Sequence, residues 1–170
     1  MMKPMKMLVS DTSILIDLER GSLLETCFRL PFQFAVPDLL YERELKNYGG
    51  DNLLRLGLRI EELDSTGVAC ALRYRREQPL ISLPDSFALA LAASNTWTLL
   101  TGDGALRGLA NEERVDCHGV LWLLDLMFEV SAASANELHA GLTAISVHPR
   151  CRLPKAEIRK RLGRWRQDSH

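Results

Sequence analysis

Short apolar runs alternate along the chain with longer segments whose apolar residues recur every three or four positions. The longer segments are predicted helices, because this spacing places apolar side chains on one helical face. The short runs are predicted strands, at residues 5–10, 32–36, 58–63, 96–100 and 114–117. Strands separated by helices indicate an α/β fold, in which a parallel sheet is covered by helices on both faces.

The predicted helices begin and end at residues that commonly cap helices. Pro37 suits the first turn of one helix, which runs to about residue 46 and is stopped by NYGG at 47–50. A second helix, opened by LPD at 83–85, is nearly apolar all round, so we expect it to be buried. Further helices are predicted at 13–19, 22–29, 65–77, 105–110 and 119–130.

The charge of the chain is unevenly distributed. The 170 residues, of which 46% are hydrophobic, suit one domain. Residues 150–166 hold eight Lys or Arg and one Glu, a balance of +7, and the net charge of -1 therefore leaves the rest of the chain at -8. We expect a domain over residues 1–148 and a basic helical tail over 149–170. Nucleic-acid contact would have to come from such a local patch.

The sequence offers no segment suited to export or membrane insertion. The apolar stretch at the amino terminus is interrupted by Pro4 and Lys6, and the apolar run at 120–130 contains two acidic residues. The four cysteines lie far apart without a CxxC pair, which argues against a structural zinc site. We therefore expect a cytoplasmic protein without membrane contact.

Three aspartates stand where predicted strands end or helices begin: Asp11, Asp85 and Asp103. In a parallel sheet these positions fall on one edge, so the carboxylates can converge. Clustered carboxylates repel one another unless a cation neutralises them, and Mg²⁺ or Mn²⁺ prefers oxygen ligands. Taken singly, each aspartate is more simply a helix cap or a turn residue. Together they favour a metal site suited to phosphodiester hydrolysis.

Four segments, in order, resemble the acidic segments of PIN-domain ribonucleases: VSDTSILIDL, VPDLLYERELK, SLPDSFALALA and LLTGDGALR. The resemblance covers roughly residues 6–130. It implies a three-layer α/β/α fold with a central parallel sheet of four or five strands, here followed by a helical carboxyl-terminal extension. It also implies an endoribonuclease that depends on Mg²⁺ or Mn²⁺ and prefers single-stranded RNA, most often the VapC-like toxin of a toxin–antitoxin pair.

The resemblance assigns roles to individual residues. It implies that Asp11, Asp85 and Asp103 bind the metal and that Ser13 is the small hydroxyl residue that often follows the first aspartate. A further acid found in some members near the start of the next helix is missing, since GAL follows Asp103. The number of metal ions therefore stays open.

A glutamate from the helix after the second strand completes the set implied by the resemblance. The usual spacing from Pro37 falls on Arg43, which lies between Glu42 and Glu44. We prefer Glu42, because it shares the predicted inward face with two leucines. Glu44 is the alternative.

Two basic segments, at residues 73–76 and 150–166, could hold an RNA backbone. Tyr74 or Trp165 would be available to stack on a base. The alternative is that each is a solvated helix face, and in the last helix Ile158, Leu162 and Trp165 also follow the spacing of a docking stripe. The candidate RNA-binding residues are Arg73, Arg75, Arg76, Arg159, Lys160 and Arg164.

Several functions are compatible with these features. The leading one is a toxin ribonuclease with a cognate antitoxin as partner; a housekeeping RNA-processing nuclease is the runner-up. A non-catalytic PIN-like module that binds RNA or protein is a different class of function. A phosphatase with a DxDxT signature is disfavoured, because position 13 carries serine in place of the second acid. Leucine-rich helices near 121–130 and 138–145 make a homodimer our expectation.

Overall fold

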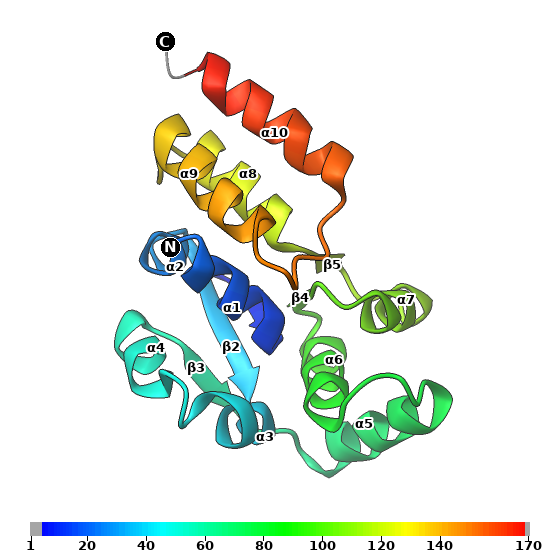
Figure 1. The fold of residues 1–170 in the computed structure, drawn as a ribbon. Coiled ribbons are helices and arrows are strands. Elements are labelled where there is room, and N and C mark those ends of the chain that lie inside the picture. Colours follow the sequence, from blue (N-terminus) through cyan, green and yellow to red (C-terminus); the bar gives the residue numbers. More distant parts are fainter. Residues whose placement is uncertain (1–4, 169–170) are drawn as a thin grey trace.

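Five parallel strands form the centre of the computed structural model, which describes residues 5–168 apart from the side chain of residue 167 (Figure 1). The strand order is β3-β2-β1-β4-β5, and each neighbouring pair is parallel. The α/β fold with a parallel sheet is therefore confirmed. The strands are β1 (Lys6–Ser10), β2 (Phe32–Pro37), β3 (Arg59–Glu61), β4 (Thr98–Leu100) and β5 (Cys117–His118).

The chain reverses direction across the sheet between β1 and β4. From β1 it moves outward to β2 and β3, and it then crosses back to add β4 and β5 on the other side. At this switch point the Asp11 amide donates to the Leu100 carbonyl oxygen at 3.0 Å. Ligands of open α/β sheets bind at the carboxyl ends of the strands beside such a switch point. The topology thus marks the edge that contains Asp11.

Helices flank the sheet and bury its apolar residues. In one group α6 contacts β1, β2 and β4, and α5 packs on α6, whereas α1, α2, α8 and α9 contact one another in a second group. The helix predicted to be nearly apolar, α6, is buried as expected, and residues 88–92 are almost fully inaccessible to solvent. The helices are α1 (Thr12–Arg20), α2 (Leu24–Phe28), α3 (Asp38–Leu40), η1 (Tyr41–Leu45), α4 (Gly50–Leu56), α5 (Ser65–Glu77), α6 (Leu83–Asn95), α7 (Gly104–Glu112), α8 (Val120–Glu129), α9 (Ala135–Ser146) and α10 (Lys155–Gln167).

The segment after β2 differs from the sequence prediction. A single helix was expected over 37–46, but the structure has a short α3, the π-helical turn η1 and a further helix, α4. Gly49 and Gly57 bracket α4 with φ of 85° and 117°, a backbone region that favours glycine. The glycines that were expected only to stop one helix therefore also delimit the next one.

The last helix packs on the body of the protein. Ile158 and Trp165 of α10 belong to the same hydrophobic core as α8 and α9. Arg161 fixes the helix further, because its guanidinium donates to both carboxylate oxygens of Asp125 on α8, at 2.9 and 2.8 Å. Within residues 5–168, every helix is too short or too polar to cross a membrane.

Candidate metal centre

Asp11 is the buried centre of the candidate site. It follows β1, caps α1 and is 2% exposed. Its Oδ1 accepts from the Ser13 hydroxyl at 2.7 Å and from the Ile14 amide at 3.1 Å, and its Oδ2 accepts from the Thr101 hydroxyl. Burial raises the pKa of Asp11, whereas these three hydrogen bonds lower it. Ser13 thus contacts Asp11, the aspartate that it follows in the DTS segment.

Asp103 lies beside Asp11 because Thr101 links the two. The Thr101 hydroxyl donates to Asp11 and accepts from the Asp103 amide at 3.0 Å. The Asp103 carboxylate caps α7 and accepts from the Leu106 amide at 3.0 Å. Asp11 and Asp103 therefore cap helices, which was the alternative interpretation of these aspartates. They also lie at the same edge of the sheet.

Asp85 comes to the same place from the first turn of α6. Ser82 caps that helix and accepts from the Asp85 amide at 3.1 Å. The pKa of the Asp85 carboxyl is raised to about 7, first by burial and then by the negative charges of three other acids, Asp11, Glu44 and Asp103. Three other carboxylates are therefore close enough to repel that of Asp85.

Glu44, and not Glu42, reaches this cluster. The Thr12 hydroxyl, at the start of α1, donates to Glu44 Oε2 at 2.9 Å. The Glu42 side chain is 59% exposed and pairs with Lys46 at 3.1 Å. The placement favours the alternative from the sequence, Glu44, over the preferred residue, Glu42.

A π-helical turn begins between Pro37 and Glu44 and changes the spacing of the acids along the helix. The Lys46 amide donates to the Tyr41 carbonyl oxygen at 2.8 Å, which is the i→i+5 bond of a π turn. Such a turn contains one residue more than an α turn. Where regular spacing from Pro37 falls on Arg43, the added residue brings Glu44 to the site. The off-by-one spacing was itself the signal that could have indicated a bulge.

Three supporting residues were missed by the sequence analysis: Thr12, Thr101 and Arg107. The threonines orient Glu44 and Asp11 through their hydroxyl groups. Arg107, on α7, donates from Nη2 to the Thr101 carbonyl oxygen at 3.0 Å and so fixes the loop after β4. Hydroxyl residues beside a candidate acid, as in DTS and TGD, were the available signal for the two threonines.

The donor set at this edge fits a hard divalent cation. Its donors are carboxylate and hydroxyl oxygens, and the charged groups that shift the pKa of Asp85 are all acidic. Across residues 5–168, no three His, Cys, Asp or Glu side chains are already gathered closely enough to hold an ion. A cation bound among the acids would neutralise their mutual repulsion.

The candidate RNA-binding residues fall on two helices, α5 and α10. Arg73 pairs with Glu77 and Glu113 at 3.0 and 3.3 Å, so its charge is already compensated. The expected stacking residues are buried: Tyr74 is 2% exposed and Trp165 is 0% exposed. Neither can stack on a base, which corrects that expectation. Arg75 and Arg76 are exposed near the end of α5, where Glu77 lines a hollow together with Gly104, the neighbour of Asp103. The helix α10, with Arg159, Lys160 and Arg164, lies across the molecule from α3 and α6 (Figure 1).

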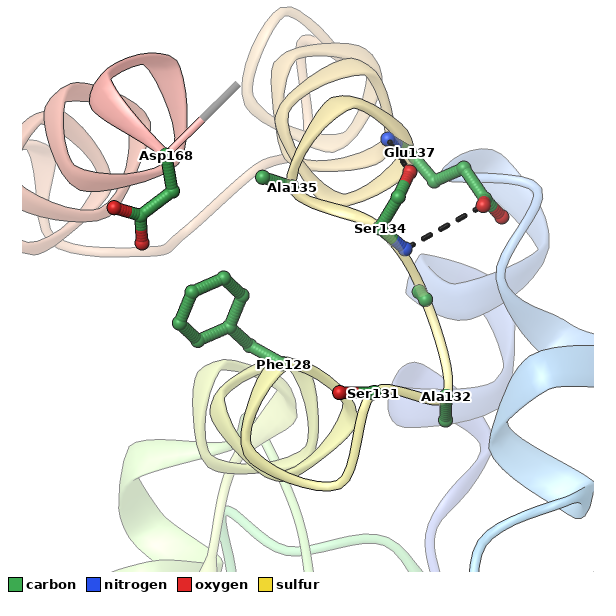
Figure 2. A pocket seen from close by; sticks show the side chains of 8 residues that line it. Phe128, Ser131, Ala132, Ser134, Ala135, Glu137 and Asp168 are labelled. Atoms are coloured by element: carbon green, nitrogen blue, oxygen red, sulfur yellow. Dashed lines mark hydrogen bonds between the residues drawn. The ribbon is translucent and has the colours of Figure 1, made fainter. Parts of the chain in front are cut away.

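A hollow of about 660 Å³ also lies away from the four acids, between the ends of α8, α9 and α10 (Figure 2). Its polar groups are largely occupied by the cap of α9, where the Glu137 amide donates to the Ser134 hydroxyl at 3.1 Å and the Ser134 amide donates to the Glu137 carboxylate at 3.4 Å. The lining residues therefore serve the helix terminus, and we assign them no chemistry.

Comparisons with known proteins agree with this architecture. A family model described as a PIN domain matches residues 7–167. Among solved structures, the chain is similar to a PilT N-terminus domain protein from the hyperthermophilic archaeon Sulfolobus solfataricus, with a TM-score of 0.50 and 15% sequence identity over 72% of this chain and 94% of that chain. At this identity the likeness shows a shared fold. A search of curated proteins found no match.

Proposed function

The chain belongs to the PIN-domain family, and from this premise we propose that it hydrolyses phosphodiester bonds of single-stranded RNA with the help of Mg²⁺ or Mn²⁺. PIN domains are generally nucleases and typically use divalent metal ions. The observation that carries the proposal is the convergence of acids from four separate segments: besides burial, the charges of Asp11, Glu44 and Asp103 help to raise the pKa of Asp85 to about 7. A structural role gives no reason to collect so much like charge.

The residues that would hold the cation are Asp11, Asp85, Asp103 and Glu44. When bound, it would activate a water for attack on the phosphodiester and stabilise charge on the leaving oxygen. Thr101 orients the buried Asp11 carboxylate through its hydroxyl. The amino ends of α1, α6 and α7 also meet at this edge, and their partial positive charges favour anionic groups there.

Within this activity, we propose Glu44 in place of Glu42 as the fourth acid. The support is the hydrogen bond from Thr12 and the effect of the Glu44 charge on Asp85. Glu42 contributes an exposed ion pair with Lys46, which has little energetic weight.

The deciding experiment is cleavage of single-stranded RNA with Mg²⁺, with Mn²⁺ or with EDTA. We expect activity that requires a cation and is lost in Asp11→Asn and Asp103→Asn. The matched control is Asp51→Asn, which removes an exposed acid on α4 and should cleave normally. Cleavage in EDTA, or full activity of both site variants, would contradict the metal-dependent mechanism.

For the biological role we propose the toxin of a toxin–antitoxin pair, on the resemblance of the four acidic segments to VapC-like proteins. Expression should arrest the growth of a bacterial host, and co-expression of a small neighbouring gene should relieve the arrest. Arrest by the Asp11→Asn variant would argue instead for a non-catalytic binding module. Cleavage without arrest would favour RNA processing.

A further inference from the structure

We propose that the exposed face of α10 is a binding surface for the backbone of single-stranded RNA, separate from the carboxylate cluster. The proposal rests on the proposed function, since it names the place where the substrate is held. It goes beyond that function because binding at α10 needs neither a metal ion nor the four acids.

One side of α10 packs against the protein, so the opposite side faces solvent. Ile158 is 7% exposed and Trp165 is fully buried. Arg161 is committed to Asp125 and also pairs with Glu157 at 2.8 Å. The helix is therefore presented as a rigid element and not as a loose tail.

The exposed side of α10 carries two rows of cations. Residues four or seven apart lie on one helix face. This spacing places Lys155, Arg159 and Arg166 in one row and Lys160 and Arg164 in the other. The Arg164 guanidinium lies over the Phe128 ring, 4.6 Å from its centroid, which fixes the second row.

Small residues separate the two rows. Ala156 and Gly163 are seven residues apart and exposed, and the space around the Gly163 Cα is open. A backbone of phosphates could therefore approach the helix closely between the flanking cations. Both rows could contact it at once.

These cations form no ion pair in the described part of the chain, although the charge of Lys160 acts on the neighbouring Glu157. In the described part of the chain, the ion pairs of α10 all involve Arg161, which leaves five positive side chains in the two rows without an ion pair. Arg73 on α5 differs in this respect, because two glutamates hold it. Arg75 and Arg76, also on α5, are exposed and form no ion pair among the described residues, so α10 is distinguished by carrying five such cations on one face.

Charge balance favours RNA as the occupant. Residues 150–166 carry +7 while the remainder of the chain carries -8, and the acidic cluster itself repels phosphate in the absence of a cation. Neutralisation of phosphates by Lys and Arg supplies most of the affinity in non-specific nucleic-acid binding. Since Trp165 is buried and cannot stack, recognition at α10 would depend on the backbone and not on base identity.

The position of α10 sets a requirement on RNA length. It lies across the molecule from α3 and α6, which flank the carboxylate edge (Figure 1). An RNA held at α10 must therefore be long enough to cross the protein before it reaches the acids. Short RNA would gain nothing from the helix.

The test measures RNA binding without cleavage, in the Asp11→Asn background. The variant is Arg159→Gln with Arg166→Gln, and the matched control is Arg55→Gln with Arg114→Gln, which removes the same charge from exposed positions elsewhere. The probe is a labelled RNA of about 30 nucleotides, longer than common single-strand sites of about 4–16. We expect the α10 variant to bind about 10-fold more weakly at low salt. Its salt slope should fall by about 1.4, since each contact to a single strand contributes about 0.7.

Three results would overturn the inference. The first two are unchanged binding by the α10 variant and an equal loss of binding by the control. The third is that poly-glutamate displaces the labelled RNA at a lower concentration than unlabelled RNA of the same charge does. The last would indicate an acidic protein partner. Circular dichroism and thermal unfolding should show both variants folded, because the changed side chains are exposed. Retained binding with no cleavage by the wild type would overturn the proposed function alone.

Discussion

At the scale of single residues, hydroxyl groups determine how the acids are presented. Thr101 donates to Asp11 and accepts from the Asp103 amide, while Thr12 donates to Glu44. Threonine suits this role, because its branched side chain has few rotamers, which limits the positions that its hydroxyl oxygen can take. The carboxylates consequently have defined orientations before any cation arrives.

The choice between the two glutamates can be tested directly. Glu44→Gln should lower the rate of RNA cleavage about 100-fold or more, because it removes one charge from the cluster and weakens the bond with Thr12. Glu42→Gln should stay within about twofold of the wild type, since it changes an exposed ion pair. An inactive Glu42 variant beside an active Glu44 variant would restore the preference drawn from the sequence.

The raised pKa of Asp85 predicts how stability depends on pH without metal. The folded protein holds this proton up to about pH 7, whereas the ordinary value is 3.8, so folding favours the protonated form. The stability that Asp85 contributes is thus present below its ordinary pKa, falls as the pH rises through this range, and is lost above about 7.

Thermal unfolding in EDTA measures this effect. The wild type should lose more stability than Asp85→Asn between about pH 5 and about pH 8. Asp51→Asn, at an exposed position, should follow the wild type. Equal pH dependence in wild type and Asp85→Asn would show that folding does not raise the pKa of Asp85 as described.

At the scale of elements, the sequence predicted most helices. It did not predict the π turn η1 or the ion pair that holds the last helix, α10. Helical spacing correctly placed an apolar stripe on α10, because Ile158 and Trp165 are buried. It could not reveal that Arg161 binds Asp125, 36 residues away, since a long-range ion pair leaves no periodic trace. The π turn was hidden for a similar reason, because a pattern with a regular period cannot represent an added residue.

The docking of α10 through Arg161 gives a prediction at this scale. Arg161→Lys should lower the free energy of unfolding by about 1 kcal/mol, because lysine cannot make the two parallel hydrogen bonds to Asp125. Arg159→Lys, on the exposed face of the same helix, is the control and should have little effect. Urea unfolding distinguishes the two, and equal stability of both variants would mean that apolar packing alone holds α10.

At the scale of the whole molecule, the parallel sheet was predictable and its strand boundaries were less so. Short buried runs separated by helices can form few other folds, and aspartates at strand ends identified one edge. The strand expected at 114–117 is confined to Cys117–His118, because the Val115 amide instead donates to the Ala110 carbonyl oxygen at the end of α7. Which helices meet across the core depends on contacts between distant segments, which local patterns do not encode.

Under the proposed function, divalent cations should stabilise the whole fold, because only the folded chain assembles the proposed site. At a concentration about 100 times the dissociation constant, Mn²⁺ should add about 2.7 kcal/mol to the free energy of unfolding. Melting temperature measured against Mn²⁺ concentration checks this. Asp11→Asn with Asp103→Asn should not respond, whereas Asp51→Asn should respond like the wild type, and stabilisation of all three alike would indicate binding elsewhere.

The bond from the Lys46 amide to the Tyr41 carbonyl oxygen also identifies where the chain can change length without disturbing the sheet. Removal of Arg43 would convert this turn to an ordinary α turn, with the glutamate after it still at the edge and the strands before and after it in register. Insertions and deletions among relatives should therefore collect in η1 sooner than in α6, whose buried residues permit no shift. If Glu44 is the fourth acid, as proposed, related sequences should align at this acid only when a gap is allowed in η1.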